Sequence, residues 1–386
     1  QSIAQQLIEQ GQAYLCFCTQ EELEHKRQRA TQKQETYQYD RSCRNLNVDA
    51  LPKDKAYVIR FKVQTESPDF VFDDQIKGSI TIPSEQIDDF VLLRSDGTVT
   101  YNFAVVVDDI ESKITHIIRG EEHLFNTPKQ ILLYQALHAL VPKFAHIPLI
   151  LGSSGQKLSK RDGATSVIDY KTEGYLPHAL CNYLVRLGWS HENQEIFSTE
   201  EMINYFSLSG IQHSGAKFDM EKLKWVNNHY IKLLRAEDIL QMFAQALGKD
   251  LVAKTPDFTD EQRYAWIKLY QDRVATLKEL YDLVVAAYFL PVRYDWESLH
   301  QLIAKDVVIV LQLLQQELRN VSFEKNILSG RIKDFCKTHE YKVSDIAQLL
   351  RFVILGSVSG PSVFEMMQLL GSQEIQRRIS IVLAEL

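Results

Sequence analysis

Long apolar runs are absent from this sequence. No stretch approaches the roughly 18 consecutive apolar residues that a membrane-spanning helix needs, and the polar opening QSIAQQLIEQGQ lacks the character of a signal peptide. Low-complexity tracts are absent too, while 45% of the residues are hydrophobic and 24% are charged, which is typical of an ordinary globular chain. We therefore expect a soluble, cytoplasmic protein with no membrane partner.

Cysteine is scarce as well. The five cysteines in 386 residues are Cys16, Cys18, Cys43, Cys181 and Cys336. They do not suggest a disulfide framework, so reduced thiols or a metal site are the two interpretations that remain. An excess of positive charge is also missing, because the net charge is −7. That value argues against a protein that coats nucleic acid without selection, but it leaves room for a local basic track.

The chain is long enough for two to four domains, and its apolar pattern divides it into four zones. Residues 1–101 begin as a helix and continue with strand patterns such as AYVIRFKV, which predicts an α+β insertion. Residues 102–150 hold FAVVVDDI, THIIRG and FAHIPLILG as short apolar strands around one amphipathic helix, which predicts part of a parallel βαβ sheet. Residues 151–234 are predicted to be mostly helical, and residues 235–386 to form an all-α half.

The stretch LILGSSGQKLSKRDGATSV, residues 149–167, follows an apolar strand and is rich in glycine and serine. Its glycines allow the backbone to approach a ligand closely, while Lys157, Lys160 and Arg161 supply positive charge. This combination suits a phosphate-rich ligand. A solvated basic turn is the alternative, and the stretch does not match the GxxxxGK[ST] pattern of a Walker A loop.

The letters KLSKR resemble the second signature, the KMSKS-like motif, of class I aminoacyl-tRNA synthetases. The surroundings resemble the bacterial glutamyl-tRNA synthetases in the stretches VFDDQIKG, DGTVTYNFAVVVDDIESKITHIIRGEEHLFNTPKQ, FAHIPLILGSSGQKLSKRDGATSV, GYLPHALCNYLVRLGWSHENQEIFS and FDMEKLKWVNNHYI. This resemblance covers nearly the whole chain and is dense over residues 57–231.

The resemblance implies an α/β fold, with a partial class I Rossmann-type catalytic domain followed by all-α domains. Residues 1–101 would be the acceptor-stem-binding insertion, and residues 102–150 the second half of the catalytic domain. Residues 151–234 would hold the KLSKR loop and a helical stem-contact domain, and residues 235–386 the anticodon-binding domains.

The resemblance also implies an ATP site. Lys157 and Lys160 match the lysines that hold the ATP phosphates and stabilise charge while the carboxylate attacks the α-phosphorus. Leu149 and Ile150 match the pair whose backbone meets the adenine ring. A role as plain strand core remains compatible with that match, because backbone contacts leave both side chains free to pack.

Tyr101 and Arg119 match the tyrosine and the arginine that bind glutamate in this family. A planar guanidinium can hold the γ-carboxylate bidentately and leaves the neutral amide of glutamine poorly matched. Taken alone, Tyr101 would be a strand aromatic and Arg119 a surface charge. The nearby Glu121 and Glu122 are expected to cap a helix N-terminus.

Cys16, Cys18 and Cys43 resemble the zinc-binding element in the acceptor-binding domain of some glutamyl-tRNA synthetases. Tetrahedral zinc needs four ligands, and the family's fourth would fall at Asn45, which is a poor ligand. Tyr39 matches a tyrosine that completes the site in related glutamyl-Q enzymes. Three free thiols without a metal are the alternative.

The helical half resembles domains that read the anticodon by stacking and hydrogen bonding to splayed bases. The stretch LLRFVILGSVSGPSVFEMMQLLG resembles the family's anticodon-loop segment, which implies that Arg351 contacts a base. It also implies that backbone and small side chains approach the bases at Gly360 and Val363. Arg273 is a second candidate, and either arginine could instead be an exposed helix charge. A glutamyl-Q-tRNA(Asp) synthetase is disfavoured, because such enzymes lack this helical half.

The HIGH-type signature and the arginine-rich segment that open a class I synthetase have no counterpart in this sequence. We therefore expect the chain as given to be incomplete for catalysis. The resemblance implies a monomeric enzyme that ligates L-glutamate to tRNA(Glu) through glutamyl-adenylate, with ATP and Mg²⁺ and one structural Zn²⁺. A catalytically inactive paralogue that binds tRNA is the competing hypothesis.

Overall fold

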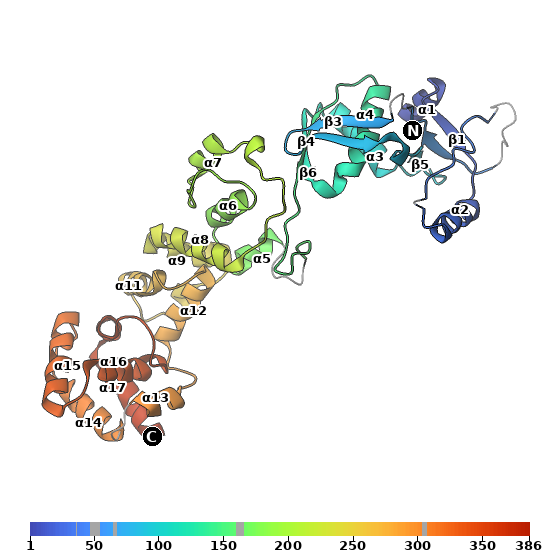
Figure 1. Ribbon diagram of the computed structural model, residues 1–386. Helices are drawn as coiled ribbons and strands as arrows, with labels where there is room; N and C mark the ends of the chain where they lie inside the picture. The colour runs from blue at the N-terminus through green and yellow to red at the C-terminus, as the bar shows by residue number, and fades with distance from the viewer. Residues whose placement is uncertain (36, 47–54, 65–67, 160–165, 303–306) are drawn as a thin grey trace. The chain divides into compact units, whose positions relative to one another are not determined.

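The computed structural model describes residues 1–35, 37–46, 55–64, 68–159, 166–302 and 307–386, without the side chains of residues 300–302 (Figure 1). These residues form two compact units. The first consists of Gln1–Leu158, Leu187–Glu195 and Glu200–Phe218, and the second of Ser159–Arg186, Ile196–Thr199 and Asp219–Leu386. No helix among the described residues combines the length and apolar character that crossing a bilayer requires.

The first unit begins with an antiparallel sheet in the order β1-β2-β5. Its strands are β1 (Ala13–Cys16), β2 (Val58–Phe61) and β5 (Val91–Leu93). Helix α1 (Ser2–Glu9) precedes the sheet and buries Ala4 and Leu7 in the core of the unit. Helix α2 (Gln20–Gln32) begins at a capping box, in which Thr19 and Glu22 satisfy each other's backbone N–H groups. The predicted helix followed by strands is therefore confirmed for this zone.

A second sheet in the first unit has the order β4-β3-β7-β6. Its strands are β3 (Asp69–Asp74), β4 (Gly78–Pro83), β6 (His116–Gly120) and β7 (Lys143–Ile147). Strands β6 and β7 are parallel, and the short 3₁₀ helix η3 (Glu121–Asn126) and helix α4 (Thr127–Ala136) connect them. This connection confirms the predicted βαβ unit.

The prediction that FAVVVDDI is a strand was wrong, because these residues lie in helix α3 (Tyr101–Glu111). Its valines favour strands by propensity, but Phe103, Val106 and Ile110 are spaced as on one face of a helix. That face packs into the core of the first unit, where α3 lies against α4 (Figure 1). Tertiary packing thus overrides the local preference of the β-branched residues.

The second sheet also crosses the boundary that the sequence pattern placed at residue 101. Strands β3 and β4 come before that residue, yet β3 pairs in parallel with β7 at Asp74 and Phe144. Phe72 and Ile82 accordingly share one core cluster with Phe144. The pairing joins residues far apart in the chain, so the local pattern of alternation carries no sign of it.

Every regular element in the described part of the second unit is a helix, which agrees with the prediction of an all-α half. These helices are α5 (Val167–Thr172), α6 (Pro177–Arg186), α8 (Met220–Leu233), α9 (Ala236–Leu247), α10 (Leu251–Lys254), α11 (Asp260–Gln271), α12 (Leu277–Tyr288), α13 (Trp296–Leu302), α14 (Val307–Glu317), α15 (Lys325–His339), α16 (Val343–Leu355) and α17 (Val363–Glu385). Helix α7 (Thr199–Tyr205) comes between α6 and α8 in the chain, and all of it except Thr199 belongs to the first unit. One apolar cluster extends from Leu176 to Val382 and encloses the fully buried Trp266.

Arg378 of α17 is completely buried in this second unit. Its Nη1 donates to Ile354 O at 2.7 Å, and its Nη2 donates to Ala287 O at 3.1 Å and to Tyr288 O at 2.9 Å. These carbonyls belong to the last turns of α16 and α12, where backbone acceptors have no partner within their own helix. The Nε of Arg378 donates to Glu374 at 2.8 Å. One guanidinium therefore ties the ends of two helices to a third.

We expect Arg378→Met to destabilise the second unit by roughly 3–5 kcal/mol, because it leaves the three helix-end carbonyls without this donor and removes one of the two cations that bond Glu374. Arg377→Met is the matched control, since Arg377 bonds the same carboxylate but its side chain is 56% exposed. Urea unfolding followed by far-ultraviolet circular dichroism measures both. Equal and small shifts in the two variants would contradict the role given to Arg378.

Candidate active site and binding residues

Arg119 on β6 is held by three side-chain hydrogen bonds. Its Nε donates to His146 Nε2 at 3.1 Å, and its Nη2 donates to Thr127 Oγ1 at 2.8 Å and to His123 O at 3.3 Å. The side chain is half-buried, and burial lowers the pKa of its guanidinium, which nevertheless stays charged. These bonds use Nε and Nη2, and the guanidinium also interacts with the exposed Tyr101.

Tyr101 opens helix α3 and lies beside the same guanidinium. It is 53% exposed, and its ring lies 5.7 Å from that of His123. Interaction with Tyr101 partly offsets the effect of burial on the pKa of Arg119. The structure therefore brings together the two residues predicted to bind glutamate, one anchored in the sheet and one open to solvent.

Behind Arg119 lies a pair of buried polar residues that the sequence reasoning did not select. The register of β6 and β7 pairs Arg119 with His146. His146 is fully buried, and its Nδ1 lies 2.6 Å from Oδ2 of Asp74, a residue of β3 that is 4% exposed. The sequence does hold a signal for this pair, since Asp74 in VFDD and His146 in FAHI are polar residues inside apolar strands. A polar group that is buried in this way needs a partner.

Leu149 and Ile150 follow β7 and lie at the same end of the sheet. The Leu149 N–H donates to Glu121 Oε1 at 3.2 Å, and the Ile150 carbonyl accepts from Leu158 N at 2.8 Å. Among the described residues, none bonds the Leu149 carbonyl or the Ile150 N–H. One backbone acceptor and one backbone donor thus remain next to each other, which is what the edge of an adenine ring requires.

Glu121 and Glu122 contact lysines rather than acting only as helix caps. Glu121 pairs with Lys77 at 2.7 Å, and Glu122 pairs with Lys157 at 2.9 Å. The partner lysine lowers the pKa of each carboxyl. The expected role of these residues as caps therefore misses their main contacts. Lys160 and Arg161 lie outside the described residues.

Three cysteines and a tyrosine converge beside the antiparallel sheet. The sulfur atoms of Cys16, Cys18 and Cys43 all lie within 4.8 Å of one another. The Tyr39 hydroxyl lies 3.2 Å from Cys16 Sγ and 3.7 Å from Cys18 Sγ. Burial raises the pKa of Tyr39 and of Cys43. The pKa of Cys18 is lowered in spite of burial by hydrogen bonds with Ser42, Tyr39 and the other two cysteines.

The predicted anticodon residues lie together in the second unit. Arg351 of α16 donates from Nε to Pro361 O at 2.9 Å, and a Cβ placed on Gly360 would lie 3.7 Å from its Cδ. Burial lowers the pKa of Arg351, and the charge of the nearby Arg273 lowers it further. Val363 as a whole is 1% exposed, so the structure buries the residue that was predicted to approach the bases.

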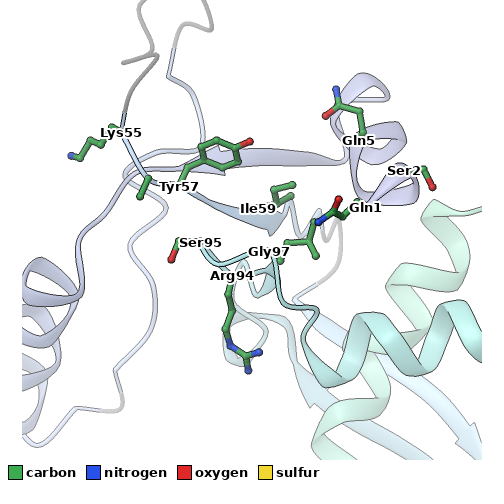
Figure 2. Close-up of a pocket in the computed structure, with 11 residues that line it drawn as sticks. Gln1, Ser2, Gln5, Lys55, Tyr57, Ile59, Arg94, Ser95 and Gly97 are labelled. Carbon is green, nitrogen blue, oxygen red and sulfur yellow. The ribbon is translucent and has the colours of Figure 1, made fainter.

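A separate hollow of about 750 Å³ borders the antiparallel sheet, and Figure 2 shows the side chains around it. Its lining includes Gln1, Tyr57, Ile59 and Arg94. None of the residues predicted to bind ATP, glutamate, zinc or the anticodon takes part in it. This hollow is therefore distinct from the sites described above.

Two family models match the chain. Residues 1–225 match the family described as tRNA synthetases class I (E and Q), catalytic domain, and residues 228–383 match an anticodon binding domain. The first match contains Arg119 and the cysteine cluster, and the second contains Arg351.

Curated relatives and solved structures agree with these matches. A glutamate–tRNA ligase of Syntrophotalea carbinolica is 41% identical over 99% of this chain and 81% of its own length. Glutamate–tRNA ligase 2 of Wolbachia pipientis is 44% identical over 98% of the chain and 81% of its own length. The crystal structure of a glutamate tRNA ligase from Elizabethkingia meningosepticum, in complex with its amino acid, superposes with a TM-score of 0.85 at 31% identity, and covers 99% of this chain and 82% of that one.

Proposed function

The chain belongs to the class I tRNA synthetases for glutamate and glutamine, and from that premise we propose how its own residues serve the ATP-dependent ligation of glutamate to tRNA. We further propose that it acts as a monomer in the cytoplasm on tRNA(Glu), through glutamyl-adenylate. Use of ATP with Mg²⁺ follows from membership of the class. The observation that carries the proposal is the anchored guanidinium of Arg119 beside Tyr101.

Glutamate recognition would rest on Nη1 of Arg119, together with the Tyr101 hydroxyl that interacts with the same guanidinium. Because Nε and Nη2 already donate to His146, Thr127 and His123, the γ-carboxylate would receive Nη1 rather than a full guanidinium fork. The Tyr101 hydroxyl would supply a second donor. A carboxylate accepts from both, whereas the amide nitrogen of glutamine would bring donors against donors.

We expect Arg119→Ala to raise the KM for glutamate by about 10²-fold, because it leaves a buried carboxylate without its cation. Lys143→Ala is the matched control, since Lys143 is an exposed cation on the adjacent strand β7. Steady-state aminoacylation with labelled glutamate, at saturating ATP and tRNA, measures both variants in an enzyme that also carries the HIGH-type segment. Wild-type glutamate kinetics in Arg119→Ala would remove this residue from the amino-acid site.

ATP would bind with its adenine against the Leu149 carbonyl and the Ile150 N–H. Lys157 and Lys160 would hold the phosphates and stabilise charge that develops as the glutamate carboxylate attacks the α-phosphorus. Lys157 rests on Glu122 at 2.9 Å with its side chain 62% exposed, so it would exchange that carboxylate for phosphate oxygens when ATP binds.

Cys16, Cys18, Cys43 and Tyr39 would hold a structural zinc ion. Four ligands at about 2.3 Å around a tetrahedral zinc lie roughly 3.8 Å from one another. The separations of 3.6 Å between Cys18 and Cys43 and 3.7 Å between Cys18 and the Tyr39 hydroxyl are close to that value. The donor set therefore fits the metal, which would tie the strand β1 to the segment after α2.

Protein purified without chelator should contain about one zinc per chain by elemental analysis, and Cys43→Ser should abolish it because too few ligands remain. Cys181→Ser is the control, since Cys181 is exposed and lies in the second unit. Tyr39→Phe should weaken retention without abolishing it. Equal zinc content in Cys43→Ser and wild type would place the metal elsewhere.

Arg351 and Arg273 would bind the anticodon. Neither arginine forms an ion pair with a carboxylate among the described residues, and the charge of Arg273 lies close enough to lower the pKa of Arg351. Two unneutralised guanidinium groups close together favour an anionic ligand. The hydrogen bond to the Pro361 carbonyl fixes the direction of the Arg351 guanidinium. A fixed direction is needed to donate hydrogen bonds to the edge of a base.

Arg351→Ala should weaken binding of tRNA(Glu) by about 1–3 kcal/mol and reduce the preference over a transcript with a substituted anticodon. Arg331→Ala is the control, because Arg331 is an exposed arginine of the same unit that pairs with Glu317. Filter binding with both transcripts at two salt concentrations measures the effect. An equal loss for both transcripts would indicate a phosphate contact rather than base recognition.

A further inference from the structure

Three neighbouring strands place Asp74, His146 and Arg119 in a row. Asp74 ends β3, His146 lies in β7 and Arg119 lies in β6. Asp74 Oδ2 is 2.6 Å from His146 Nδ1, and His146 Nε2 is 3.1 Å from Arg119 Nε. Asp74 and His146 are both buried, so this row runs from the interior of the sheet to the half-buried guanidinium.

The protonation states along this row follow from its surroundings. Burial alone would raise the pKa of Asp74, but donors from the Lys77 and Ile76 backbone and from His146 hold the pKa below its usual value. Burial lowers the pKa of His146, whose ring therefore stays neutral near pH 7. An ionised carboxylate at 2.6 Å requires the ring proton on Nδ1. Nε2 is then a lone pair, and it can accept the Nε–H of Arg119.

We propose that Asp74 and His146 are positioning residues for glutamate, which fix the tautomer that accepts from Arg119 and thereby aim Nη1 at the γ-carboxylate. This inference rests on the proposed role of Arg119. With Nε held by His146 and Nη2 by Thr127, the plane of the guanidinium is defined on two sides. Thr127 is itself fully buried. A donor that is already oriented does not lose further freedom when the substrate binds.

The opposite tautomer would place an N–H on Nε2 against the Nε–H of Arg119, donor facing donor, and would direct that proton to Thr127 Oγ1 at 3.1 Å, the acceptor that Nη2 of Arg119 also uses. The guanidinium cannot give up a proton to relieve that conflict. It would have to rotate away from His146, and the bonds of Nη2 to Thr127 and His123 would change with it. Orientation of Nη1 therefore depends on a carboxylate that does not touch glutamate.

Asp74→Asn tests the inference with little change of shape. Asp74 Oδ1 accepts the N–H groups of Ile76, Lys77 and His146 at 3.0, 2.9 and 3.2 Å, and the oxygen of the introduced amide can keep all three. Its NH₂ group would replace Oδ2 and donate to Nδ1, which moves the ring proton to Nε2. Asp73→Asn is the control, because Asp73 is the adjacent carboxylate of β3 and is exposed.

In an enzyme that also carries the HIGH-type segment, we expect Asp74→Asn to raise the KM for glutamate at least tenfold, with the KM for ATP unchanged, and Asp73→Asn to behave as wild type. A purely structural role would lower the amount of folded enzyme without this selective change in KM. His146→Gln can present an oxygen toward Arg119 and should retain more glutamate affinity than His146→Leu, which has no acceptor. Equal KM values for the two His146 variants would overturn the inference.

Nitrogen-15 NMR of the histidine rings gives a readout that needs no variant to fold. In the wild-type chain, the His146 signals should show a protonated Nδ1 and an unprotonated Nε2, and a proton on Nε2 would overturn the inference directly. Arg119→Ala distinguishes failure of the positioning role from failure of the proposed amino-acid site. If Arg119→Ala raises the KM for glutamate and Asp74→Asn does not, the positioning role fails while the proposed function stands; if neither does, the proposed amino-acid site itself fails.

Discussion

The parallel pairing of β6, β7 and β3 is the constraint on which the amino-acid site depends. Neighbouring strands lie about 4.8 Å apart and their side chains alternate between faces, so a register that pairs Arg119 with His146 also sets which atoms can touch. A slip of one residue would turn His146 to the opposite face. Phe72 and Phe144, which share the core of the first unit, oppose such a slip by their burial. Apolar packing thus fixes the geometry of charged groups.

The sequence predicts this site unevenly, and the reason lies in how far apart the contacting residues are. Tyr101 and Arg119 lie in recognisable motifs, and the structure brings them together. Asp74 and His146 are 72 residues apart, and their contact depends on strand order, which no local pattern contains. The same limit explains α3, where buried Phe103 and Val106 fit a helix although the valines around them favour a strand. The sheet that joins β3 to β7 is invisible for the same reason.

The second unit shows that residue type alone does not separate structure from binding. Arg351 and Arg378 both lie on helices that pack in the apolar core, so residue type and helical pattern alone do not distinguish their roles. In the structure, Arg378 is fully buried and its donors go to Glu374 and to three helix-end carbonyls. Arg351 has one backbone acceptor and a second arginine nearby. The hydrogen bonds of Arg378 therefore stabilise the fold, whereas Arg351 keeps N–H groups that can donate to a partner.

Two of the cations proposed for substrate binding, Lys157 and Arg119, differ in how firmly they are held, and the difference matches the steps they would serve. An exposed ion pair such as Lys157 with Glu122 contributes about 1 kcal/mol or less, so the several negative charges of ATP can displace it easily. Arg119, in contrast, is fixed by His146 and Thr127 before any ligand arrives. Discrimination between a carboxylate and an amide requires a donor that does not adapt, because a mobile cation could follow the carbonyl oxygen of glutamine. Binding of ATP phosphates by an exposed lysine requires the opposite. The strand register supplies the first kind of donor, and the surface pairing of Lys157 supplies the second.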